Sequence, residues 1–195
     1  MKKSDARITS VRYVIFILML LSDTAAAQDR LSRIEASFEG GQIEQVSFRE
    51  IAQMLLMTDS DSQLLLFDVR EPEEFEVGHL PGAIWLSPDA DVSLFIEQYS
   101  SQLAEHTVVF YCSTGRRSSA LALDVKTALQ EQNSTLPAPA NMKGGIFRWH
   151  NAALPLVNAS GSTTKIHPFN WTWRLSLERS KETSYRADVS ASASQ

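Results

Sequence analysis

Residues 108–118 read VVFYCSTGRRS, a short apolar run followed by the only cysteine of the 195-residue chain and then by small, polar and basic residues. The run at 108–111 predicts a strand that is buried on both faces, as in a parallel sheet. A helical pattern begins at Ser118, where Leu121, Val125 and Leu129 share one face. The stretch therefore predicts a strand, a tight loop that begins with the cysteine, and a helix.

The same alternation of strand and helix continues elsewhere in the chain. Residues 64–67 (LLLF) form a second apolar run, which Asp68 follows directly, and helical spacing is present at residues 92–103. Alternating strands and helices predict an α/β fold with a mainly parallel sheet. Because reactive groups gather at the carboxyl ends of strands in such sheets, we expect Asp68 and Cys112 at the same edge.

The first 27 residues have the three-part pattern of a secretory signal. Four basic residues lie within the first twelve, an apolar run spans residues 13–21, and small residues at 25–27 precede Gln28. The apolar run is shorter than the roughly 20 residues that cross a bilayer. The pattern predicts export, to a bacterial periplasm, with cleavage after residue 27 and no stable membrane span afterwards. A membrane anchor formed by an uncleaved signal is the alternative.

The chain beyond this signal is acidic. Residues 1–27 hold four basic and two acidic side chains, which leaves 14 Lys and Arg against 21 Asp and Glu, a net charge of −7. An acidic surface disfavours nonspecific binding of nucleic acid, so no nucleic-acid partner is expected. A single cysteine forms no disulfide within the chain, and a free thiol in an oxidising compartment indicates that the thiol is used. The four scattered histidines show no metal-ligand spacing, and no metal is predicted.

The loop that begins with Cys112 has the features of an anion-binding site. Backbone N–H groups at the start of a helix bind anions, and the helix dipole adds positive charge. Gly115 allows a backbone conformation that a side chain would hinder, and Arg116 and Arg117 add permanent positive charge. This environment favours the thiolate, which is the reactive form of cysteine. An inert buried cysteine is the alternative, but it would be expected among apolar neighbours.

Three segments, in order, resemble the signatures of rhodanese-domain sulfurtransferases. The first in the chain is FDVREPEEFEVGHLPGAIWL at 67–86, the second is the loop Cys-x-x-Gly-x-Arg-Ser at 112–118, and the third is MKGGIFRWHNAALPLV at 142–157. They place a rhodanese-like domain at residues 43–157. The resemblance implies an α/β fold whose five-stranded, largely parallel sheet is flanked by helices on both faces.

The resemblance also implies a two-step reaction that uses no cofactor. The Cys112 thiolate attacks the outer sulfur of a small-molecule donor such as thiosulfate and becomes a persulfide. Cyanide, a small thiol or a protein acceptor then removes that sulfur, while loop amides hold it in the manner of an oxyanion hole. By the same resemblance, the substrate-binding residues are Ser113, Thr114, Gly115, Arg116 and Arg117.

Asp68, Arg70 and Ser118 are expected to support this loop. Asp68 would either orient the loop by pairing with Arg117 or form a structural ion pair with Arg70. The second role is favoured because chemistry at sulfur needs no carboxylate base. His79 is a potential base for the cysteine, but in the family's turn this residue packs and forms hydrogen bonds.

Three other functions compete with an efficient sulfurtransferase. Protein tyrosine phosphatases separate the cysteine and the arginine of their loop by five residues, whereas only four separate Cys112 from Arg117 here. A thiol-redox protein would need a second, resolving thiol. A persulfide carrier or binding module that acts with a specific protein partner stays open.

Three segments lie between or beyond these parts of the chain. Residues 28–42 predict a polar lead-in of weak helical character. Residues 158–179 are unusually aromatic and predict an arm, which either packs on the domain or offers a surface to a partner or a membrane interface; the packed arm is favoured. Residues 180–195 are small and polar and predict a disordered tail.

Overall fold

The computed structural model describes residues 26–37, 42–56 and 64–187. Residues 26–36 form a helix, called the N-terminal helix below. The further helices and strands are, in chain order, β1 (Gln45–Val46), α2 (Phe48–Leu56), β2 (Leu64–Asp68), α3 (Pro72–Val77), β3 (Ile84–Trp85), α4 (Val92–Glu105), β4 (Thr107–Tyr111), α5 (Arg116–Glu131), β5 (Ala140–Met142), α6 (Gly145–Asn151), β6 (Leu156–Asn158), β7 (Gly161–Thr163), and the 3-10 helices η1 (Trp173–Ser176) and η2 (Ser180–Glu182).

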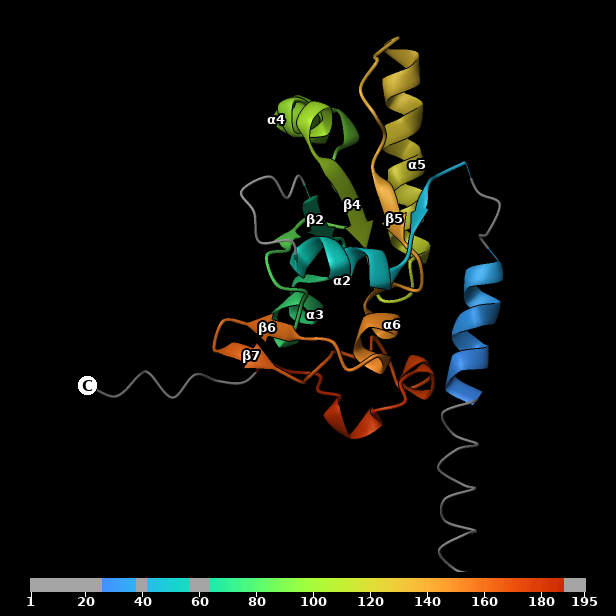
Figure 1. Cartoon of the computed structure of the whole chain (residues 1–195), viewed down its shortest axis with the longest axis vertical. Coiled ribbons are helices and arrows are strands. Elements are labelled where there is room, and N and C mark those ends of the chain that lie inside the picture. The colour runs from blue at the N-terminus through green and yellow to red at the C-terminus, as the bar shows by residue number, and fades with distance from the viewer. Residues whose placement is uncertain (1–25, 38–41, 57–63, 188–195) are drawn as a thin grey trace, which may run out of the picture.

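Five strands form one sheet in the order β1-β5-β4-β2-β3 (Figure 1). Every pairing between neighbours is parallel. The longest pairing joins β2 to β4, from Leu64 opposite Thr107 to Asp68 opposite Tyr111. The two apolar runs of the sequence are therefore neighbouring strands, with β4 in the middle of the sheet, and the predicted α/β fold is confirmed.

The side chains of the central strand alternate between two core layers. Val109 and Tyr111 belong to one layer, which the N-terminal helix, α2 and α6 cover. Val108 and Phe110 belong to the other layer, which α4 and α5 cover. Successive side chains of a strand point to opposite faces, so a strand buried on both faces has no polar positions. This is why β4 reads as an unbroken apolar run.

Two helix starts follow from local side-chain hydrogen bonds. The backbone N–H of Ser47 donates to Glu50 Oε2 (2.8 Å), and the N–H of Glu50 donates to Ser47 Oγ (3.2 Å), which is a capping box for α2. Asp91 Oδ1 accepts the N–H groups of Ser93 and Leu94 at the start of α4. These caps satisfy N–H groups that have no partner within the helix.

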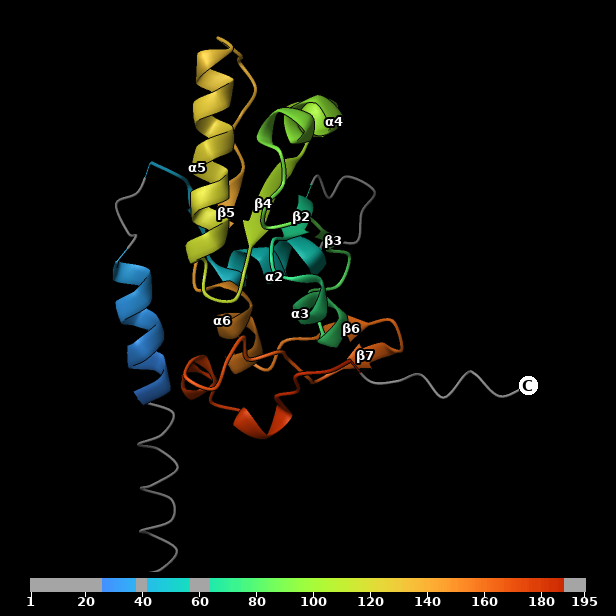
Figure 2. The ribbon, with the colours of Figure 1, turned by 180° about the vertical axis from the view of Figure 1, so that it is seen from behind.

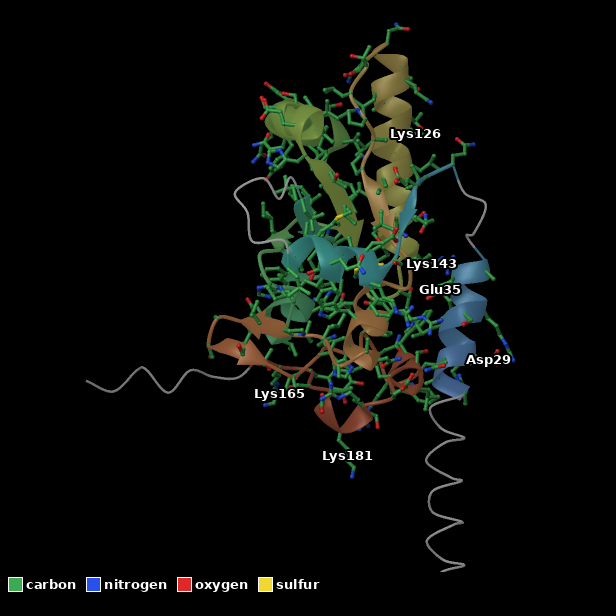
Figure 3. The ribbon with its side chains drawn as sticks, in the orientation of Figure 1. Asp29, Glu35, Lys126, Lys143, Lys165 and Lys181 are labelled. Atoms are coloured by element: carbon green, nitrogen blue, oxygen red, sulfur yellow. The ribbon has the colours of Figure 1, made fainter. Side chains whose placement is uncertain are left out.

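The N-terminal helix packs on the domain. Leu31 is fully buried in the first core layer, and Arg148 of α6 donates to Glu35 Oε1 (2.7 Å) and to Ser32 Oγ (2.8 Å). Glu35 lies on the side of this helix that faces the domain (Figure 3). The lead-in predicted at 28–42 is therefore a docked helix over much of its length.

The C-terminal arm (residues 158–179) also packs on the domain. Its first residues complete the antiparallel hairpin of β6 and β7, and its Ile166 and Leu177 are buried in the first core layer. The arm gathers at one end of the molecule, below α3 and α6 (Figures 1 and 2). Of the two roles considered for these residues, the structure shows packing.

The prediction that a disordered tail begins at residue 180 is wrong for the first residues of that segment. Residues 180–182 form η2, and Thr183 pairs with Ile166 of the arm through two backbone hydrogen bonds on either side of the bridge. The backbone N–H and carbonyl groups of Ile166 form hydrogen bonds with the backbone of this segment. Composition alone does not reveal such a partner. The rest of the predicted tail, residues 188–195, lies outside the described residues.

The predicted signal lies almost wholly outside the described residues as well. Only residues 26 and 27 of it are described, and they belong to the N-terminal helix. Among the helices of the described ranges, none has the length and the apolar character needed to cross a membrane.

A buried ion pair closes the carboxyl end of β2. Arg70 donates from Nη2 to Asp68 Oδ2 (2.6 Å) and from Nε to Asp68 Oδ1 (2.8 Å), and both side chains are fully buried. Arg70 Nη2 also donates to the carbonyl oxygen of Gly78 (2.8 Å). This is the structural ion pair that the sequence favoured over a pair between Asp68 and Arg117.

Replacing Arg70 with alanine is expected to destabilise the fold strongly. Arg70→Ala leaves the Asp68 carboxylate buried without its partner, which costs about 3–5 kcal/mol of the free energy of unfolding. Urea denaturation measures the change. Arg33→Ala is the control, because Arg33 pairs with Asp29 on the exposed surface and its loss should not be resolved. Equal effects of the two variants would contradict the structural role of Arg70.

Candidate active site

Cys112 lies at the carboxyl end of the central strand. It follows β4 directly, and α5 begins four residues later, after Gly115, whose positive φ of 91° turns the loop into the helix. The arrowhead of β4 points toward the end of the molecule where the arm lies (Figure 1). The cysteine therefore occupies the edge of the sheet at which parallel α/β proteins place their sites.

The start of α6 fixes the outer side of the loop. The N–H of Ile146 donates to the carbonyl oxygen of Cys112 (2.9 Å), and the N–H of Phe147 donates to that of Ser113 (3.0 Å). A Cβ atom on Gly145 would overlap the carbonyl oxygen of Cys112. Gly145, the second glycine of the Gly-Gly pair in the third sequence segment, is thus needed for the close approach of α6, which satisfies the loop carbonyls from outside.

The thiol forms the floor of a pocket. Cys112 is 1% exposed, and the N–H of Gly115 donates to its Sγ (3.2 Å). An amide donor on sulfur at the start of a helix stabilises a negative charge there. The pocket has a volume of about 330 Å³ and is lined by Cys112, Ser113, Thr114, Arg116, Arg117, Ala120, Phe169 and Trp173.

A buried carboxylate, Glu74 of α3, holds the loop from below. Its Oε2 accepts from Arg117 Nη2 (2.9 Å) and from the N–H of Glu71 (3.1 Å), and its Oε1 accepts from Ser113 Oγ (3.0 Å). Arg117 Nη2 also donates to Ser113 Oγ (3.2 Å). Glu74 therefore caps its own helix and fixes two residues of the cysteine loop at once.

The pKa values of this pair show that both groups are charged. Burial alone would raise the pKa of Glu74, but the guanidinium groups of Arg70 and Arg117 outweigh it and lower the pKa. Burial alone would lower the pKa of Arg117, but Glu74 and the sulfur of Cys112 outweigh it and raise the pKa. The two shifts agree in direction with a strong ion pair beside the thiol.

Tyr111, the last residue of β4, adds a second buried polar group. The hydroxyl of Tyr111 accepts the N–H of Leu80 (3.1 Å), and burial, together with the nearby Asp68 carboxylate, raises the pKa of Tyr111 well above its usual value. Tyr111 therefore stays protonated. With the ion pair of Asp68 and Arg70, it forms the polar support of the site.

Ser118 supports the loop from the first turn of α5. Its Oγ donates to Asn141 Oδ1 (2.6 Å), and Asn141 Nδ2 donates to Gln45 Oε1 (2.7 Å). Ser118 and Asn141 are fully buried. This chain of hydrogen bonds fixes the start of α5 to β5 and β1.

His79 packs against Phe75 and lies within hydrogen-bond distance of its carbonyl oxygen. Its Nδ1 is 2.9 Å from the carbonyl oxygen of Phe75, and its ring stacks on the Phe75 ring with centroids 3.6 Å apart. Burial lowers the pKa of His79, with partial opposition from that carbonyl oxygen. The packing role holds for this residue. Within the described ranges, no group of three or more His, Cys, Asp or Glu side chains is placed to bind a metal ion.

The structure brings most of the predicted residues together. The cysteine and four of the five predicted binding residues line the pocket, while Gly115 contributes its N–H. Three residues were missed: Glu74, Phe169 and Trp173. Glu74 lies in the acidic run EPEE, which reads as the ordinary start of a helix. The aromatic arm was noticed in the sequence, but nothing in it indicated contact with the cysteine loop.

Comparisons with known proteins agree with this architecture. The model of the rhodanese-like domain family matches residues 50–152. A sulfurtransferase of Allochromatium vinosum is 28% identical over 119 residues, which are 61% of this chain and 99% of that protein. A Bacillus subtilis protein named as a sulfur carrier, YrkF, is 38% identical over 69 residues, 35% of either chain. The chain thus matches about a third of the length of that relative.

Among solved structures, the thiosulfate sulfurtransferase of Pseudomonas aeruginosa is 17% identical with a TM-score of 0.48, covering 79% of this chain and 26% of that one. The structure places this chain among α/β proteins that have a parallel sheet and a cysteine loop at the end of its central strand. Within that class, the family match covers more than half of the chain. The chain belongs to the rhodanese-like domain family.

Glu74 and Arg117 are expected to be energetically coupled. Glu74→Gln and Arg117→Ala each leave a charge without its partner, at a cost of about 1–3 kcal/mol in the free energy of unfolding. The double variant should lose less than the sum, with a coupling of about 1–2 kcal/mol. Urea denaturation of the four proteins gives this coupling.

Glu71 provides the matched control for this cycle. It lies 3.7 Å from Arg117 Nη1 and its side chain is 52% exposed, against 2% for Glu74. The cycle of Glu71→Gln with Arg117→Ala should give a coupling close to zero. Equal couplings in both cycles would show that the buried carboxylate has no special role.

Proposed function

We propose that the protein transfers sulfane sulfur through a persulfide on Cys112, as a sulfurtransferase of the thiosulfate type. The observation that carries this proposal is the thiol itself: its Sγ accepts the N–H of Gly115 at 3.2 Å, on the floor of a pocket flanked by two arginines. Such a site stabilises a charged sulfur and admits an anionic donor. The family match and the sulfurtransferase relative support the same chemistry.

The first half-reaction loads the cysteine. The Cys112 thiolate attacks the outer sulfur of thiosulfate, a new S–S bond forms, and sulfite leaves with the electron pair of the broken S–S bond. No oxidant or cofactor is needed. The terminal sulfur of the persulfide carries the negative charge, and Gly115 N–H and the start of α5 stabilise it.

The second half-reaction unloads it. A nucleophile such as cyanide or a thiolate attacks the terminal sulfur, forms a bond to it, and releases the Cys112 thiolate. Donor and acceptor use the same pocket in turn, so ping-pong kinetics follow.

Arg116 and Arg117 have different electrostatic roles. Arg117 Nη2 is committed to Glu74 and Ser113, so it fixes the loop and contributes its charge from a set position. Arg116 is exposed at the pocket and attracts an anionic donor. This division disfavours a phosphatase, whose loop arginine must be free to bind phosphate through two hydrogen bonds.

A persulfide carrier is the second candidate, because one relative is named as a sulfur carrier. A carrier uses the same first half-reaction but delivers its sulfur to a specific protein. Turnover separates the two functions: an enzyme forms thiocyanate repeatedly from thiosulfate and cyanide, whereas a carrier is loaded once and waits for its partner.

We propose further that the protein is exported to the periplasm of a bacterium. The basic leader, the short apolar run and the small residues at 25–27 support this location. Cleavage after residue 27 would fall in the first turn of the N-terminal helix and leave Leu31, Ser32 and Glu35 to pack on the domain. An uncleaved anchor is the alternative.

Intact mass spectrometry of the purified protein tests the mechanism. Thiosulfate is expected to add the mass of one sulfur atom, cyanide to remove it, and Cys112→Ala to show neither change while keeping the far-UV circular dichroism of the wild type. Thiocyanate formation over many cycles would support the enzyme over the carrier. The same spectrum, taken on protein expressed from the full chain, shows whether residues 1–27 are gone.

Two results would contradict these proposals. A Cys112→Ala variant that still forms thiocyanate would exclude the persulfide mechanism. A wild-type mass that retains residues 1–27 would favour the uncleaved anchor over cleaved export.

A further inference from the structure

The pocket over Cys112 has two sides of different chemistry. One side is the cysteine loop with the cationic Arg116 and Arg117, and the other is the C-terminal arm, which contributes Phe169 and Trp173. Its volume of about 330 Å³ falls at the lower end of the range, about 300–1,000 Å³, of pockets that take organic ligands. Thiosulfate would occupy a small part of this space and would gain nothing from an aromatic wall.

Phe169 is held in an unfavourable backbone conformation. Its φ is +63°, in the left-handed region that bulky residues rarely adopt. The turn around it is fixed: Phe169 N–H donates to His167 Nδ1 (3.1 Å), and Asn170 Oδ1 accepts the N–H groups of Thr172 and Trp173 at the start of η1. Strain of this kind persists where the surrounding structure imposes it, and it is concentrated at sites that hold ligands.

The strained turn presents an aromatic ring to the pocket. Phe169 is 43% exposed, and the guanidinium carbon of Arg117 lies 5.1 Å from its ring centroid. Trp173, the second aromatic residue of the wall, packs partly against the first core layer. An apolar ring that reaches the pocket would cover exposed surface of Phe169, while an anionic head beside it would face Arg116 and the loop.

We propose that Phe169 and Trp173 make the site selective for a sulfur donor that carries an aromatic or similarly flat apolar group beside an anionic head; this inference rests on the persulfide function proposed above. The chemistry is that of a thiosulfonate, R–SO2–S⁻. The Cys112 thiolate attacks the outer sulfur and forms the new S–S bond. The bond to the sulfonyl sulfur breaks, and the sulfinate R–SO2⁻ leaves with the electron pair. The group R lies against the two rings.

Three donors that share this outer sulfur test the proposal. They are thiosulfate, methanethiosulfonate and benzenethiosulfonate, of which the last two differ only in a methyl or a phenyl group. The measured quantity is the second-order rate constant of Cys112 persulfidation, followed by quenched-flow intact mass spectrometry. A single turnover suffices, so the measurement applies equally to an enzyme and to a carrier.

Phe169→Ala is expected to lower the ratio of the benzenethiosulfonate to the methanethiosulfonate rate constant by about tenfold. Because the ratio is compared between variant and wild type, the different intrinsic reactivities of the two donors cancel. A displacement of Arg117 that slows both anionic donors equally also leaves the ratio unchanged. Trp171→Ala is the matched control: Trp171 is on the same arm, is 73% exposed and does not line the pocket, so its ratio should equal that of the wild type.

A second variant separates the ring from the stability of the turn. Asparagine tolerates a positive φ, so Phe169→Asn removes the ring and relieves the strained backbone. It should be at least as stable as the wild type and show the same loss in the ratio.

The outcomes distinguish this inference from the function on which it rests. If all three donors load Cys112 and the ratio is unchanged in Phe169→Asn, the arm does not select the donor, and the persulfide function stands. If no donor loads Cys112, the persulfide function itself is wrong.

Discussion

The structure of the site depends on one buried carboxylate. Glu74 accepts hydrogen bonds from Arg117, from Ser113 and from the backbone of its own helix, so α3 and the cysteine loop are fixed to each other at a single point. A carboxylate this deeply buried is stable only with charged and hydrogen-bonded partners. The loop cannot shift without leaving Glu74 unsatisfied, and the position of Cys112 is thereby set before any substrate arrives.

The charged side chains around the cysteine loop are paired with one another, so the positive charge available to an anion on Cys112 comes from other groups. Asp68 is paired with Arg70, and Glu74 is paired with Arg117, so these four groups carry no net charge together. A thiolate or persulfide on Cys112 adds one negative charge that this set does not compensate. Compensation comes from the N–H of Gly115, the start of α5 and the exposed Arg116.

The parts of this molecule that could be predicted from sequence are those encoded locally. An apolar run buried on both faces identifies β4, and Asp68 pairs with a residue two positions away. The missed contacts join distant positions: Arg117 meets a carboxylate 43 residues earlier. Phe169 carried no local signal at all, because a phenylalanine gives no indication that its φ will be positive. Composition also misjudged residues 180–187, whose order depends on a partner segment, not on their own side chains.

The arm and the loop are fixed largely by separate contacts, so the arm can change with little effect on the loop. Ile166 and Leu177 bury the arm in the first core layer, and the absence of a side chain at Gly78 lets the backbone of Lys165 approach. The loop depends instead on Glu74 and on the start of α6. The arm reaches the pocket through the Phe169 and Trp173 side chains. If the arm selects the donor as proposed, a change in the arm alters which donor fits, and its effect on the loop is limited to the contact of Phe169 with Arg117.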